Sequence, residues 1–227
     1  MKNIDNKFFT IDEYNNHIEK PQTDIDGQLV YLYASDAVEQ HQFINAAKER
    51  GYDVLLLDGP IDNHFINQLE RKFEKSSFTR VDADIIDKLI KKEDALPSKL
   101  SEENQNKLKE LIEKQLEKEK YHISFEPMND KEVPFTITLP EYPRRMKDMS
   151  NTGRGMDFMG SFPMQYTLVV NSNHTVLDKI LEIKDETKQI ETIKQLTDLA
   201  KLSQNLLKGE ELTNFVKRSV DIVCKEK

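Results

Sequence analysis

The sequence predicts two successive domains: an α/β layered domain, then an α+β domain that combines a small antiparallel sheet with long helices and ends in a helix pair. Two continuous apolar runs of strand length, residues 29–33 and 53–57, flank an amphipathic segment of helical period. Residues 91–101 have no apolar period and contain Pro97, which indicates a break. From residue 176 onward, apolar side chains recur at helical spacing.

The first predicted domain begins with a helix and then forms a βαβ unit. Thr10 and Glu13 have the spacing of a capping box and predict a helix directly after Thr10. After the first apolar run, Ser35 or Asp36 can cap a helix that stops at Gly51. Because such a crossover is right-handed, we expect the two strands to be parallel, with helices on both faces of the sheet.

The rest of the first domain continues the α/β pattern. A helix is expected at residues 64–75, a short strand at residues 78–81 and a further helix around residues 84–90. The aperiodic stretch that follows is typical of a connector between domains. We therefore divide the chain into a first domain of residues 1–93 and a second domain of residues 94–227.

The second predicted domain opens with a charged helix and a small sheet. Ser101 is a natural N-cap for a helix that has one narrow apolar stripe and ends near Lys120. Three runs with strand character lie at residues 121–125, 135–139 and 165–170. Together they suggest a small antiparallel sheet.

The end of the chain is predicted to be helical, with segments at residues 176–183, 186–207 and 212–223. The last two helices carry apolar stripes, and the sequence supplies no later element to cover them. A second copy of the chain is the simplest cover, because two such hairpins meeting about a two-fold axis form a four-helix bundle. The alternative is that the hairpin packs onto its own sheet. The candidate interface residues are Ile190, Ile193, Leu196, Leu199, Leu206, Leu212, Phe215, Val216 and Val220.

A stretch rich in methionine and glycine precedes the last strand. Residues 146–164 contain five of the seven methionines and three of the seven glycines. We expect a short helix after Pro143 that ends early, because each glycine costs about 1 kcal/mol inside a helix. Exposed thioethers can repack against many apolar partners, which favours a binding surface; the alternative is that they fill a local core. The candidate binding residues are Met146, Met149, Met156, Phe158 and Met159.

Carboxylates after two predicted strands are the main candidates for chemistry. Strand ends of α/β sheets are where ligands and Mg²⁺ tend to bind. Against a metal site, an Asp before a helix is usually a cap, and the sequence has no Gly-rich phosphate loop. The five histidines are scattered without ligand spacing, so they predict no zinc site. The carboxylates are Asp58, Asp62, Asp82 and Asp84.

The composition excludes several classes of function. A net charge of −8 and an isoelectric point near 5.3 disfavour binding to a phosphate backbone. No apolar run reaches the roughly 18–20 residues of a membrane span, and the N-terminus lacks the apolar core of a signal peptide. The lone Cys224 excludes an intrachain disulfide and a multi-cysteine metal site. We therefore expect a cytoplasmic protein with no nucleic-acid or membrane partner.

Three sequence runs resemble one family of molecular chaperones. They are YDVLLLDGPIDNHFINQLE at residues 52–70, FTRVDADIIDKLI at residues 78–90 and LVVNSNHTVLDKI at residues 168–180. In this order and with these gaps, they are similar to the bacterial ninety-kilodalton heat-shock protein family, HtpG, over essentially the whole chain. The most specific part is the strand that ends in Asn171, Ser172, Asn173 and His174 before a helix, which resembles the turn into the family's dimerisation helices.

The resemblance implies the domain roles and the partners. The first domain would be the small α/β end of the family's middle domain, and the second its C-terminal dimerisation domain, which forms a homodimer through the last two helices. In the family, a Met-bearing helix contacts non-native client proteins, and Met146 and Met149 match that position. The helix after the second strand supplies further contacts, matched here by His64, Phe65 and Asn67, with His64 in place of an aromatic residue.

The resemblance also implies that this chain is a fragment without the family's ATP-binding domain. It is then expected not to hydrolyse ATP alone and to hold no cofactor, whereas the full-length family protein uses ATP and Mg²⁺. Its function would be dimerisation and client binding within a chaperone that assists protein folding. Two alternatives are a passive dimerisation scaffold without a client surface, and a Mg²⁺-dependent hydrolase or phosphoryl-transfer domain that uses the strand-end carboxylates.

Overall fold

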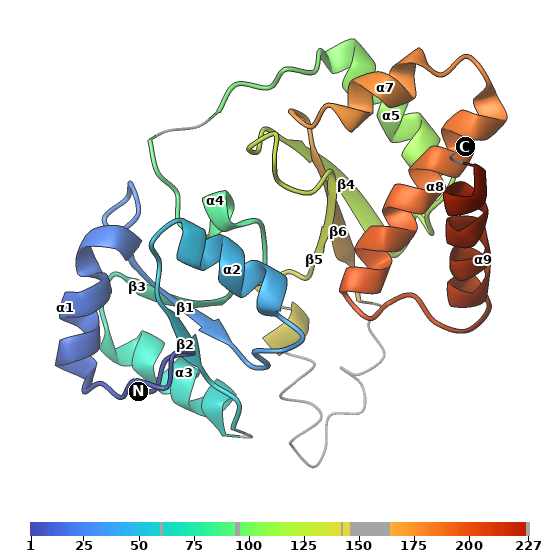
Figure 1. The fold of residues 1–227 in the computed structure, drawn as a ribbon. Helices are drawn as coiled ribbons and strands as arrows, with labels where there is room; N and C mark the ends of the chain where they lie inside the picture. Colours follow the sequence, from blue (N-terminus) through green and yellow to red (C-terminus); the bar gives the residue numbers. More distant parts are fainter. Residues whose placement is uncertain (60, 94–95, 142, 146–163, 226–227) are drawn as a thin grey trace. The chain divides into compact units, whose positions relative to one another are not determined.

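The computed structural model describes the chain apart from residues 60, 94–95, 142, 146–163 and 226–227 (Figure 1). The described residues form two compact units. Unit 1 takes its residues from Met1–Asp94 and Thr138–Met164, and unit 2 from Ala95–Ile137 and Gln165–Lys227. Unit 1 is therefore built from two separate segments of the chain. The second segment begins at Thr138, the last residue of a strand whose other residues belong to unit 2.

Unit 1 is a three-stranded parallel sheet covered by helices, as the sequence predicts. Its elements are α1 (Ile11–Gln22), β1 (Leu29–Ala34), α2 (His41–Glu49), β2 (Val54–Leu56), α3 (Asp62–Lys72), β3 (Ser76–Arg80) and α4 (Ile86–Leu89). The strand order is β2-β1-β3, and both neighbours of β1 are parallel to it. The predicted βαβ unit, β1-α2-β2, is confirmed.

The central strand β1 is buried on both faces, which explains its continuous apolar run. Val30 and Leu32 point into a cluster that includes Phe43 of α2. Tyr31 and Tyr33 point into the opposite cluster, where residues of α1 and α3 cover them. Successive strand side chains face opposite sides of a sheet, so one run supplies two cores. Burying each large apolar side chain stabilises the unit by about 1.5–3 kcal/mol.

The helix ends of unit 1 agree with the sequence at two sites and differ at one. The capping box of Thr10 and Glu13 forms, and Gly51 takes a φ of +74° after α2. The predicted cap of α2 was wrong, because this helix begins after Gln40, which makes no side-chain cap. Asp36 instead accepts hydrogen bonds from the backbone N–H groups of Val38 and Glu39, and so stabilises the turn before the helix.

Unit 2 is a small sheet with long helices. Its elements are α5 (Glu102–Glu113), β4 (Tyr121–Glu126), β5 (Phe135–Thr138), β6 (Tyr166–Asn171), α7 (Val176–Glu182), α8 (Glu186–Ser203) and α9 (Gly209–Lys225). Ser101 caps α5 as predicted, because its side chain accepts a hydrogen bond from the backbone N–H of Asn104. The order of the strands is β4-β6-β5.

The sheet of unit 2 is mixed, so the prediction of a purely antiparallel sheet was wrong. Strands β4 and β6 are parallel, with Ile123 opposite Leu168. The N–H of Asn171, at the end of β6, donates to the carbonyl of Pro134, just before β5, as in an antiparallel neighbour. Parallel pairing needs a long connection, and the whole stretch from β5 to the start of β6 lies between the two parallel strands.

The core of unit 2 lies between its sheet and helices α5, α7 and α8. Leu108 and Ile112 of α5, Ile180 of α7 and Ile193 of α8 pack with strand residues such as Leu168. Among the described residues, no side chain of α9 joins this cluster. Helix α9 runs beside α8 at the edge of the unit (Figure 1). Its attachment therefore depends on its contacts with α8.

Two asparagines, one at the end of β6 and one just after it, connect the segments of unit 2. The Asn171 side-chain oxygen accepts from the backbone N–H of Met128 at 3.3 Å and of Asn173 at 3.1 Å. The Asn173 side chain accepts from the backbone N–H of Lys99 at 2.7 Å and donates to the carbonyls of Pro97 and Met128. These are buried groups with satisfied hydrogen bonds, so this turn fixes where α7 and the terminal helices begin.

Candidate functional site

Helices α8 and α9 contact each other through polar side chains. Asp198, which is almost completely buried, pairs with Arg218 at 2.5 Å. Arg218 also donates to the side-chain oxygen of Gln195 at 2.8 Å, and the Gln195 amide donates to Ser219 at 2.9 Å. The Arg218 guanidinium lies 5.9 Å from the centre of the Phe215 ring. Directional hydrogen bonds therefore set the register of α9 against α8.

The apolar side chains of the same helices are largely exposed. On α8, Leu199 and Leu202 are three residues apart, so they share one face. On α9, Val216, Val220 and Val223 follow the spacing i, i+4, i+7, which also defines one face. We call the exposed set the terminal apolar surface. Its members are Leu199 (45% exposed), Leu202 (39%), Val216 (50%), Val220 (55%), Ile222 (44%) and Val223 (73%).

The candidate interface residues predicted from the sequence divide into three groups. Leu199, Val216 and Val220 belong to the terminal apolar surface. Ile193 and Phe215 are instead buried within their own chain. The other four candidates are partly exposed, and two of them, Leu196 and Leu206, pack against the core of unit 2. These four are Ile190, Leu196, Leu206 and Leu212.

Three members of the terminal apolar surface were missing from the predicted set. Leu202 follows Leu199 by three residues, and Val223 follows Val220 by three. Helical spacing alone therefore carries the signal for both of them. Ile222 is different, because it lies seven residues after the buried Phe215 and on the same side of the helix. Sequence periodicity would assign it to the covered face, but the structure leaves it exposed.

The predicted client-contact residues of unit 1 lie on α3. Ile66 and Leu69 of this helix are buried against the sheet. His64 and Phe65 are exposed, and Asn67 is half-buried. Helix α3 thus exposes side chains at its N-terminal end, while its inner side packs against the sheet.

The predicted binding residues of the Met-rich stretch lie outside the described residues. They are Met146, Met149, Met156, Phe158 and Met159. Glu141 and Pro143–Arg145, directly before this stretch, are helical, so the helix begins before Pro143 and not after it as predicted.

The strand-end carboxylates have local structural partners. Asp62 accepts from the backbone N–H of Gly59 at 2.7 Å, and Asp84 accepts from the N–H of the residue that follows it at 2.8 Å. Asp82 binds the Arg80 guanidinium through both oxygens, at 2.5 and 2.7 Å. Asp58 is exposed. Within the part of the chain that the structure describes, no three His, Cys, Asp or Glu side chains are grouped to hold a metal ion.

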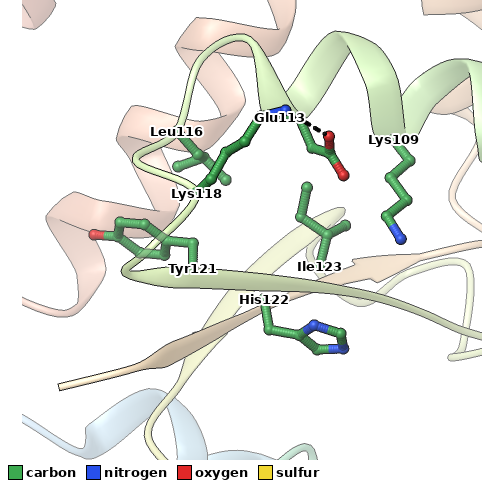
Figure 2. A pocket seen from close by; sticks show the side chains of 7 residues that line it. All are labelled: Lys109, Glu113, Leu116, Lys118, Tyr121, His122 and Ile123. Carbon is green, nitrogen blue, oxygen red and sulfur yellow. Dashed lines mark ion pairs between the residues drawn. The ribbon is translucent and has the colours of Figure 1, made fainter. Parts of the chain in front are cut away.

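A hollow of about 200 Å³ lies in unit 2 between α5 and the start of β4 (Figure 2). Figure 2 shows Ile123 pointing toward α5 and His122 away from it, as the alternation along a strand requires. Glu113 at its rim pairs with Lys118 at 3.3 Å. Lys109 is the other charged residue on this side. The hollow lacks a set of convergent polar groups, so we do not assign a ligand to it.

None of the described helices is both long enough and apolar enough to cross a bilayer. Helices α8 and α9 expose apolar side chains to solvent. These favour contact with other proteins, because soluble monomers rarely expose contiguous apolar surface.

Comparison with known proteins identifies relatives along nearly the whole chain. The family profile described as Hsp90 protein matches residues 2–221. The chaperone protein HtpG of Bacteroides thetaiotaomicron is 35% identical over 286 residues, which cover 96% of this chain and 42% of that protein. HtpG of Bacteroides fragilis shows the same identity and coverage. HtpG of Porphyromonas gingivalis is 41% identical over 212 residues, covering 92% of this chain and 30% of that protein. The chain thus spans less than half the length of these relatives.

Proposed function

This chain belongs to the Hsp90 protein family, and we propose that it is a self-pairing and client-binding part of a molecular chaperone that assists protein folding. Residues 1–93 are then the small α/β end of the family's middle domain, and residues 94–227 are the C-terminal dimerisation domain. The terminal apolar surface carries this proposal. The relatives that the chain matches are named chaperone proteins.

The arrangement of α8 and α9 supports pairing with a second copy. The hairpin places polar groups between its own helices and apolar groups in solvent, the reverse of what a stable monomer needs. Two hairpins related by a two-fold axis would bury Leu199, Val216 and Val220 in a four-helix bundle. A standard interface of about 1,600 Å² in total is enough for a specific dimer.

Client binding is proposed for the Met-rich stretch and for the exposed end of α3. Met146 and Met149 supply adaptable thioethers. On α3, His64 and the exposed ring of Phe65 present a further surface, with Asn67 beside them. Non-native proteins expose apolar segments of many shapes, and a set of adaptable apolar side chains suits such partners.

The proposed role is binding and not catalysis. Three of the four strand-end carboxylates are occupied, Asp62 and Asp84 in turns and Asp82 in an ion pair, which does not favour the Mg²⁺-dependent alternative. We further propose that this part of the protein needs no cofactor of its own and works in the cytoplasm. The net charge of −8 supports such a role, because it keeps a protein with exposed apolar surface soluble.

Replacing Met146 and Met149 together by Ser is expected to weaken the suppression of client aggregation. Each lost thioether contact is worth about 0.3–1.5 kcal/mol, so about threefold more protein should be needed for the same effect. The measurement is light scattering of a thermally unfolding globular enzyme mixed with the chain. Lys147→Ser is the matched control, because it alters the same stretch but removes no apolar group. Equal suppression by the double variant and the unmodified chain would favour the passive scaffold.

A further inference from the structure

Unit 1 contains a buried ion network that neither pairing nor client contact explains. It joins three arginines and three carboxylates around the hydroxyl of Tyr33, and the exposed fractions of the six charged side chains range from 4% to 28%. The charges balance, three against three. The charged members are Glu70, Arg80, Asp82, Glu141, Arg144 and Arg145.

Glu141 lies at the centre of this network. One of its oxygens accepts from the Tyr33 hydroxyl at 2.7 Å, from Arg144 at 2.6 Å and from Arg145 at 2.5 Å. The other accepts from the backbone N–H of Arg80 at 3.1 Å. Burial alone would raise the pKa of Glu141, but the charge of Arg144, the Tyr33 hydroxyl and Arg145 lower it below its usual value.

Arg145 and Arg144 extend the network to other elements of unit 1. Arg145 binds both oxygens of Glu70 on α3, at 2.8 and 3.1 Å, and also donates to the carbonyl of Phe78 on β3. Arg144 donates to the Tyr33 hydroxyl on β1 at 2.5 Å. We call residues 139–141 and 143–145 the anchor segment, which is thereby bonded to β1, β3 and α3.

The anchor segment has a particular place along the chain. Strand β5 of unit 2 ends at Thr138, and the N–H of Leu139, the next residue, donates to the carbonyl of Asp82. Met146, the first of the proposed client-binding methionines, directly follows Arg145. The network therefore fixes the last residues before the Met-rich stretch.

The chemistry of the network favours positioning over simple stabilisation. Burying a balanced ion cluster gains little free energy over a well-packed apolar one, because desolvation offsets the attraction. A planar guanidinium fork, however, donates to a carboxylate in only a few orientations. Apolar contacts have no such directionality. Arg145 binds both oxygens of Glu70 through such a fork, and Arg144 and Arg145 both donate to Glu141, so these directional bonds hold the anchor segment in one orientation.

We infer that this network is an anchor that fixes on unit 1 the residues directly before the Met-rich stretch, so that Glu141, Arg144 and Arg145 are positioning residues for client capture. The inference rests on the proposed function. The anchor residues themselves need not touch a client, because they act by holding Arg145, the residue that precedes Met146 in the sequence.

The anchor is expected to be insensitive to pH until the medium becomes more acidic than about 4.5. The pKa of Glu141 is lowered in the folded state, so its contribution to stability is complete above its ordinary pKa of 4.5 and is lost as pH falls below it. The measurement is thermal unfolding of the unmodified chain and of Glu141→Gln at a series of pH values. Tyr33, Glu70, Arg80, Asp82, Arg144 and Arg145 are present in both proteins, so the difference isolates Glu141. A difference that stays constant from pH 7 to pH 3 would contradict this assignment.

A matched pair of substitutions tests whether the network holds the anchor segment. Tyr33 and Tyr14 are both buried in the same apolar cluster. The Tyr33 hydroxyl bridges Glu141 and Arg144, whereas the Tyr14 hydroxyl has no hydrogen-bond partner among the described residues. Tyr33→Phe should speed tryptic cleavage after Arg144 or Arg145 about tenfold, because hydrogen bonds to charged groups are lost. Tyr14→Phe should leave cleavage unchanged. Equal rates for all three proteins overturn the anchor.

A second pair separates positioning from stability. Arg145→Met leaves Glu70 unpaired, while Arg145→Met combined with Glu70→Gln restores the balance of charge without restoring the fork. We expect the double variant to unfold at nearly the urea concentration of the unmodified chain. It should still be cleaved about tenfold faster after Arg144 and should suppress client aggregation less, because orientation is lost. Full recovery of both properties overturns the positioning role. If the unmodified chain suppresses no aggregation, the proposed function is wrong. The tryptic cleavage rates still test whether the network holds the anchor segment, because they do not depend on client binding.

Discussion

Leu199→Glu combined with Val220→Glu is expected to convert the proposed dimer to a monomer at micromolar concentration. Both side chains are about half exposed in a single copy, so the fold of unit 2 should tolerate the change. In a two-fold interface each substitution occurs twice, and an unpaired buried carboxylate costs several kcal/mol. The dissociation constant should rise at least about a hundredfold, since 1.4 kcal/mol corresponds to a factor of ten. Sedimentation velocity over a range of concentrations measures it.

The control for this experiment is Asn214→Glu. Asn214 is exposed on α9, about 100° around the helix from the buried Phe215, and lies on the side opposite Val216 and Val223. It adds the same charge to the same helix and should leave the dimer intact. Phe215→Glu is unsuitable as a probe, because Phe215 is buried within its own chain and its loss would damage the hairpin. A monomer in the unmodified chain, or a dimer that resists the double change, would defeat the pairing proposal.

The sequence was sufficient to predict the parallel sheet of unit 1. The run at residues 29–33 is continuously apolar because β1 lies at the centre of the sheet and has a core on each face. The direction of β4 against β6 was not predictable in this way. Successive side chains point to opposite faces along both strands in the same way whether the strands run parallel or antiparallel. Their relative direction is therefore decided only by the long-range pairing between them.

The terminal helices show a second limit of sequence patterns. Ile193 and Leu199 belong to one apolar stripe of α8 when only residue types are considered, but the two side chains point about 120° apart. Ile193 faces the sheet, and Leu199 faces solvent. Distinguishing them requires knowing where the sheet lies. The anchor could not be predicted either, because it depends on which distant segments meet in the fold. Glu141 and its partner Tyr33 are 108 residues apart in sequence.

Arg218→Met is expected to detach α9 from α8. Asp198 would remain almost completely buried with only Lys194, at 3.7 Å, as a cationic partner. Removing one member of a buried ion pair costs about 3–5 kcal/mol, because the other charge is left uncompensated. Gln195 would lose a donor as well. Amide hydrogen exchange should therefore become faster throughout α9, by more than a hundredfold where the helix opens as a unit.

Asp198→Asn combined with Arg218→Met should recover most of the protection, because no buried charge then remains unpaired. Lys217→Met, at an exposed neighbouring position, is the matched control and should leave exchange unchanged.

Helix α9 carries four of the six residues of the terminal apolar surface, so detaching it should also weaken the proposed dimer. The concentration dependence separates holding α9 against α8 from pairing with a second copy. Arg218→Met should lower the protection of α9 even at concentrations where the chain is monomeric. Leu199→Glu should have an effect only at concentrations where the chain is dimeric. A single Arg218→Met chain whose α9 keeps its protection would show that the buried ion pair does not hold the hairpin together.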